Sequence, residues 1–186
     1  MPTITHEFDW PDRLVVGTIG QPGERTFYLQ ASAGARVVSV VLEKEQSAIL
    51  ADKIDEILDH LMAQNGNQFS VPELTPVELV DNEPLQQPVE PEFRTATMTL
   101  GWDPTTAQIV IEAFPDVESD DADDPLAAEP AEVLRVRIPV GTARAFTQRT
   151  QEIVGAGRPI CPLCGAPMDA GGHVCAVSDD NAEPDF

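Results

Sequence analysis

The sequence predicts an α+β fold: two halves, each with three strands followed by a helix, form a mainly antiparallel sheet or a partly open barrel, and a small zinc ribbon follows. Three observations predict it. Short segments with alternating or β-branched residues, typical of strands, occur in two stretches, 14–42 and 94–138. A helical period follows each stretch, and all three cysteines fall within fifteen residues near the C-terminal end.

The first half contains three expected strands and one helix. Alternating or β-branched residues predict strands over 14–19, 26–31 and 36–42, and a glycine- and proline-containing turn over 20–23 joins the first two. A helix is expected next, because large apolar residues recur at the spacing i, i+4, i+7, i+8 and i+11. These residues are Leu50, Ile54, Ile57, Leu58 and Leu61.

The second half repeats this order. Alternation predicts strands over 94–102, 108–114 and 134–138, the last with one solvated face because arginines alternate with aliphatic residues. A helix is expected over 142–154, and Gly155 is a typical stop. Because residue identity between the halves is negligible, the repeat is a hypothesis about architecture alone.

The charge distribution predicts which segments are extended. Eleven Lys and Arg residues oppose thirty-two Asp and Glu residues, for a net charge of -21. Three segments rich in acids contain no basic residue, so we expect them to lie outside the packed core. The predicted organisation has three parts. An α+β domain (1–156) contains a Pro- and acid-rich linker or long loop (66–92) and an acidic insertion (115–131). A zinc-ribbon-like module (157–177) and a disordered acidic tail (178–186) follow.

Composition also argues against several classes of protein. A strongly negative field repels phosphate, so a nucleic-acid partner is not expected. No apolar run approaches the roughly 20 residues of a membrane-spanning helix, so no membrane association is expected. The first residues resemble no signal peptide, and the predicted location is the cytoplasm, where thiols stay reduced.

The cysteines and one histidine have the spacing of metal ligands. Cys161, Cys164, His173 and Cys175 form the pattern C-x2-C-x8-H-x-C. A CxxC turn can wrap one ion, and Gly165 can adopt the positive φ that closes the turn. The pattern predicts a structural Zn²⁺ site with three sulfur ligands and one nitrogen ligand. A redox-active CxxC pair and unligated thiols are the alternatives.

Arginines concentrate near the C-terminal end of the α+β domain. We expect Arg144 and Arg149 on the outer side of the last helix, and Arg158 introduces the zinc module. One interpretation is that these arginines neutralise the protein's own acidic segments. The other is that they form a docking surface for an acidic partner or for RNA phosphate.

A second candidate site lies in the first predicted hairpin. Arg13 and Arg25 flank a glycine-rich turn, and two guanidinium groups can hold a phosphate or a carboxylate. Asp12 and Tyr28 are the further candidates. If these four side chains converge on one pocket, an enzyme or ligand-binding role gains support.

The two ends of the chain resemble a known family. Residues 8–18, 20–31, 157–169 and 172–175 look like an uncharacterised actinobacterial family that is known only as a domain of unknown function. The resemblance implies a cytoplasmic protein with a C-terminal zinc-ribbon-like end, and it implies no activity.

The functional hypothesis is a non-enzymatic adaptor or regulatory protein, without catalytic residues, whose zinc ribbon and arginine-bearing helix contact another macromolecule, most simply a protein. The alternative is a hydrolase or a nucleotide- or phosphate-processing enzyme with its site at the N-terminal hairpin.

Overall fold

The computed structural model describes residues 3–117, 130–157, 160–166, 168 and 173–175. The acidic stretch 118–129, Arg158 and the predicted tail lie outside the described residues. Seven strands and two α-helices follow one another along the chain: β1 (Ile4–Asp9), β2 (Arg13–Ile19), β3 (Thr26–Ala33), β4 (Arg36–Leu42), α1 (Lys44–Ala63), β5 (Pro91–Asp103), β6 (Gln108–Pro115), β7 (Glu132–Pro139) and α2 (Val140–Gly155).

The strands form one mixed sheet in the order β1-β7-β6-β5-β4-β3-β2. Antiparallel pairing within β2-β3-β4 and within β5-β6-β7 confirms the two groups of three strands, each followed by a helix. The groups join through a short parallel ladder between β4 and β5, and β1 pairs with β7 in parallel. Strand β1 was not predicted. It pairs with a strand more than 120 residues away, and Phe8 is its one buried residue.

The sheet is curved but not closed. Its two edge strands, β1 and β2, are joined by only three residues. The edges of a flat seven-stranded sheet would lie about 29 Å apart, whereas the chain from Asp9 to Arg13 spans at most about 14 Å. The short connection therefore requires the sheet to curl. Backbone hydrogen bonds tie the connection to other strands, from Trp10 N to Arg137 O (3.2 Å) and from Asp12 N to Ser32 O (2.9 Å).

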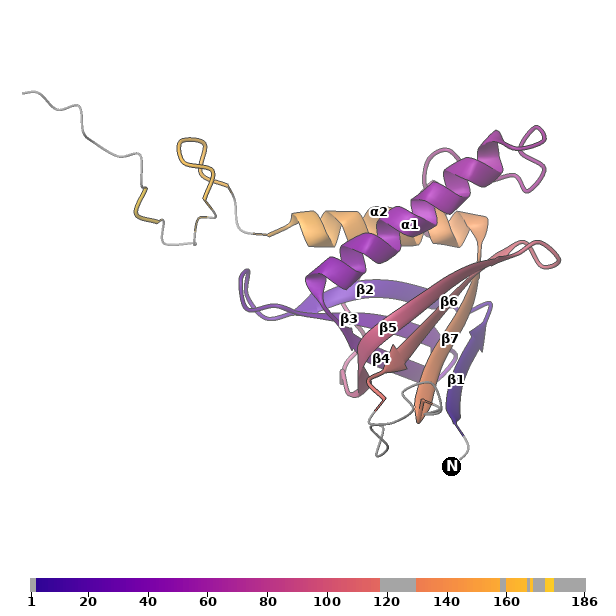
Figure 1. Ribbon diagram of the computed structural model, residues 1–186, viewed down its shortest axis with the longest axis horizontal. Helices are drawn as coiled ribbons and strands as arrows, with labels where there is room; N and C mark the ends of the chain where they lie inside the picture. The colour runs from indigo at the N-terminus through magenta and orange to yellow at the C-terminus, as the bar shows by residue number, and fades with distance from the viewer. Residues whose placement is uncertain (1–2, 118–129, 158–159, 167, 169–172, 176–186) are drawn as a thin grey trace, which may run out of the picture.

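Both helices cover the same side of the sheet, as Figure 1 shows. The alternating residues of the strands and the predicted apolar face of α1 meet there in one core. Side chains that are fully buried in it include Val16, Leu29, Val40, Ile54, Leu58, Ile109, Val136 and Ile138. Among the described residues, neither helix combines the length and the apolar composition that crossing a bilayer requires.

Residues 64–90, between α1 and β5, form a long loop with one 3-10 turn, η1 (Val77–Leu79). The loop packs on the domain through buried Val71 and Leu85. Leu85 lies against Gly17 of β2, where a methyl group on the glycine would come within 2.5 Å of Leu85 Cγ. Gln30 of β3 exchanges two hydrogen bonds with the backbone of Gln86, at 2.8 and 3.1 Å. The loop is therefore fixed to the sheet by specific contacts.

Candidate metal centre

The predicted metal ligands begin in a tight turn. The amide of Gly165 donates to the carbonyl of Cys161, and the amide of Cys161 donates to the carbonyl of Ala166, both at 2.9 Å. Gly165 has φ of +70°, a conformation that glycine adopts without strain. These contacts reverse the chain around the first two thiols, which explains why the sequence places a glycine directly after Cys164.

The structure brings all four predicted ligands together. Their candidate ligand atoms lie within 4.8 Å of one another. The Sγ atoms of Cys161 and Cys175 are 3.9 Å apart, and Cys164 Sγ is 3.1 Å from His173 Nε2. Two sulfurs on one tetrahedral zinc ion stand about 3.8 Å apart, given a Zn–S bond of about 2.3 Å. The four residues can therefore hold a metal ion.

The turn also favours the thiolate form of its first cysteine. Backbone hydrogen bonds from Cys164 and Leu163 are the main reason that the pKa of Cys161 lies below its ordinary value. Metal ions bind the thiolate and not the thiol, so these two further amides of the turn prepare Cys161 as a ligand. The Cys161 residue is also buried, while the other three ligands are half-buried.

With this geometry established, the comparisons with known proteins place the chain in a family. A family model described as "Protein of unknown function (DUF3090)" matches residues 6–175. The chain belongs to the DUF3090 family. The match runs from β1 to the last predicted metal ligand, so the DUF3090 region includes both the sheet and the four candidate ligands. No curated protein and no solved structure matches the chain significantly.

The arginines of α2 do not point outward. Arg144 is only 8% exposed, and its guanidinium group binds Asp55 and Asp59 of α1 at 2.8 and 2.9 Å. Its Nε donates to the carbonyl of Pro72 at 3.0 Å. The prediction that Arg144 lies on the outer side of the helix is therefore wrong. Helix α2 packs a polar side against α1 in addition to its apolar side. The spacing of apolar residues in the sequence does not reveal this polar side.

Arg149 is also directed inward, and it meets Arg13. Both guanidinium groups bind the carboxylate of Asp81 in the long loop. Both also donate to the carbonyl of Glu83, each at 2.7 Å. The hydrogen bond from Arg13 is the main reason that the pKa of Asp81 is lowered, and the positive charge of Arg149 lowers it further. This pair of arginines fastens the loop to β2 and α2, and the expected outer position of Arg149 is also wrong.

The four candidates of the N-terminal hairpin do not meet in one pocket. Asp12 accepts a hydrogen bond from the amide of Gly34 at 2.7 Å. Asp12 and Arg13 line one small cavity with Arg149, whereas Arg25 lines a different and larger one. Tyr28 alternates along β3 with the core residues on either side of it and lines neither of these cavities.

A second group of possible metal ligands was not recognised in the sequence. His6, Glu92 and Glu132 offer ligand atoms within 4.8 Å of one another, and His6 Nε2 lies 3.2 Å from Glu132 Oε2. The three residues come from β1, β5 and β7. No local spacing links them in the sequence, so only the sheet topology reveals the group.

Proposed function

We propose that the C-terminal residues hold a structural Zn²⁺ ion. Three sulfurs and one imidazole nitrogen form a soft donor set that suits zinc, and four protein ligands complete a tetrahedral site without an open position for substrate. A thiol-rich site of this kind suits a reducing compartment, so we place the protein in the cytoplasm. The ion would give shape to a segment with few apolar residues of its own.

We propose further that this metal-stabilised segment, residues 160–175, binds another protein and that the chain acts as an adaptor without catalysis. The supporting observation is its exposed apolar surface. Ile160, Leu163 and Val174 are 61%, 71% and 96% exposed. Large exposed apolar side chains on one short segment are typical of interaction sites, and an apolar groove on a partner protein is the surface they fit.

The proposed surface does not include the arginines of α2. Arg144 and Arg149 already bind Asp55, Asp59 and Asp81 within the domain, so docking through them would first break buried ion pairs. This arrangement supports the simpler role for the two residues, which is to neutralise acids of the same chain. Arg158 is the third arginine of that hypothesis and lies outside the described residues.

Affinity purification from native lysate tests the proposal with four forms of the full chain. The wild type and Ile49→Asp, which changes an exposed apolar residue on α1, should retain the same partner. The Cys161→Ser/Cys164→Ser variant should lose it because the metal site is gone. Leu163→Asp should lose it while keeping zinc, because only the surface has changed. Equal recovery by all four forms would contradict the proposal.

A further inference from the structure

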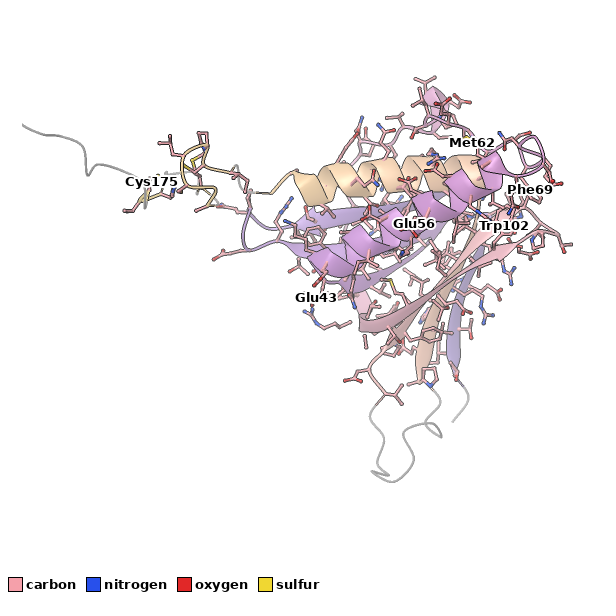
Figure 2. The ribbon with its side chains drawn as sticks, turned by 45° about the horizontal axis from the view of Figure 1, so that its top comes forward. Glu43, Glu56, Met62, Phe69, Trp102 and Cys175 are labelled. Atoms are coloured by element: carbon pink, nitrogen blue, oxygen red, sulfur yellow. The ribbon has the colours of Figure 1, made fainter. Side chains whose placement is uncertain are left out.

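A cavity of about 510 Å³ lies where α1 begins, beside the turn between β2 and β3. Figure 2 shows Glu43, one of its lining residues, at this end of the helix. Phe27 and Leu42, which are neighbours across β3 and β4, contribute its apolar lining. Three cationic residues line it as well, and we call it the cationic cavity: Arg25, Lys44 and Arg94.

Positive charge without an acidic partner is rare in this chain. The structure describes ten of the eleven Lys and Arg residues, and seven of these ten form ion pairs with carboxylates. Within the described part of the chain, the other three are Arg25, Arg36 and Lys44. Two of these three line the cationic cavity. In a protein with a net charge of -21, two such cations at one cavity favour an anion as its ligand.

Contacts within the domain hold these cations at the cavity. Arg25 donates from Nη1 to the carbonyl of Ile153 at 3.3 Å, and its guanidinium carbon lies 5.4 Å from the centre of the Phe27 ring. The Nζ atom of Lys44 lies close to Gly157. If this glycine carried a Cβ atom, that atom would be 3.3 Å from Nζ. Both contacts leave donors of the two cations available to a ligand.

The third cation of the cavity is only weakly neutralised. Arg94 forms an ion pair with Glu43, but the two side chains are 65% and 62% exposed. Exposed pairs of this kind contribute little stability and exchange readily. A more highly charged ligand can therefore compete with Glu43 for the guanidinium group.

From these observations we propose that the cationic cavity binds a small molecule that bears a phosphate group. A phosphate offers two negative charges and several acceptor oxygens, which match the guanidinium and ammonium donors that line this cavity better than a single carboxylate does. The volume falls within the range of about 300–1,000 Å³ that is usual for small-molecule sites. The apolar lining can take the uncharged part of such a ligand. This site is separate from the protein-binding role proposed above.

Calorimetric titration of the full chain with inorganic pyrophosphate tests the proposal. We expect saturable binding that weakens as ionic strength rises. Lys44→Ala should raise the Kd about tenfold, the size expected from the loss of one charge-assisted contact. Arg25→Ala should raise it similarly. Lys53→Ala removes the same charge from the same helix but outside the cationic cavity, and it should change the Kd less than about twofold.

Amide NMR shifts locate the bound pyrophosphate independently of these variants. The signals of Gly23 and Gly157, which line the cationic cavity, should move during the titration and saturate with the calorimetric Kd. The proposal is overturned if pyrophosphate gives no saturable binding at low ionic strength. It is also overturned if Lys53→Ala weakens binding as much as Lys44→Ala, because the attraction would then be unspecific.

Discussion

Arg149 binds Asp81 through both the side chain and the backbone: its Nη1 lies 3.2 Å from Oδ1 and 2.5 Å from the carbonyl oxygen of that residue. The two residues come from α2 and from the long loop before β5. Their contact shows that a loop rich in proline and acids is fixed by arginines far away in the sequence. Asp81 of this acidic loop thus helps to stabilise the fold.

Asp81→Asn tests this role. The substitution leaves two arginines, whose side chains are 16% and 11% exposed, without their shared carboxylate. We expect it to lower the free energy of unfolding by about 2 kcal/mol, because each charge loses its partner while half-buried. Urea denaturation measures the effect. Glu78→Gln removes an exposed acid from the same loop and should change stability by less than about 0.5 kcal/mol. Equal effects of the two variants would contradict this role.

Stability should also depend on pH through Asp81. Its pKa in the folded protein lies below the ordinary value of an aspartate, so the folded state favours the carboxylate. The unfolded state binds more protons in this range, and stability therefore falls as pH decreases. We expect the contribution to be complete above about pH 5 and to decrease progressively as the pH falls below about 4 and through the folded pKa.

Glu112 adds to this acid sensitivity, because a hydrogen bond from Arg135 is the main cause of its own lowered pKa. Urea denaturation at a series of pH values checks both contributions. Asp81→Asn should reduce the loss of stability in acid, whereas an unchanged pH profile would rule out the contribution of Asp81.

Gly17→Ala should destabilise the contact between β2 and the long loop. The new methyl group would lie 2.5 Å from Leu85 Cγ, so the loop must shift. Overpacking of this kind costs about 1–3 kcal/mol. The double variant Gly17→Ala/Leu85→Ala should be more stable than the sum of the two single effects predicts, because the clash is absent.

Gly101→Ala is the matched control in β5, since its methyl group would meet Val110 Cβ at an ordinary 4.0 Å. Thermal unfolding of the four variants supplies the comparison. Strict additivity of Gly17→Ala and Leu85→Ala would show that the two residues do not touch in the folded protein.

Arg144→Ala should be among the more damaging substitutions of a charged residue. The Arg144 side chain is 10% exposed, and its loss leaves Asp55 and Asp59 without their cation. We expect a cost of about 3 kcal/mol, as for other broken buried pairs. Arg94→Ala breaks an exposed pair and should cost less than about 1 kcal/mol. Chemical denaturation measures both, and similar values would show that the contact between α1 and α2 does not depend on Arg144.

Local patterns in the sequence predicted much of the fold. Alternating or β-branched residues predicted six strands, and the helical period of Leu50, Ile54 and Leu58 predicted α1, because these signals depend on neighbouring residues. The metal centre was predicted for the same reason, since its ligands lie within fifteen residues. Strand β1 was missed because its pairing is distant and only Phe8 is buried.

The partners of the arginines could not be predicted from local patterns. The Asp81 carboxylate is 68 residues from both Arg13 and Arg149, and only the folded loop brings the three together. The cationic cavity depends in the same way on Arg25, Lys44 and Arg94, which come from three separate parts of the chain. Such sites follow from the sheet topology, which single-sequence periodicity does not specify.

Mass spectrometry under non-denaturing conditions tests the proposed zinc site most directly. Full chain purified without chelators should carry one zinc ion per molecule, because Cys161, Cys164, His173 and Cys175 lie close enough to share it. The Cys161→Ser/Cys164→Ser variant should carry none. A wild-type chain that is metal-free under these conditions would contradict the account. A doubly substituted chain that retains zinc would contradict it as well.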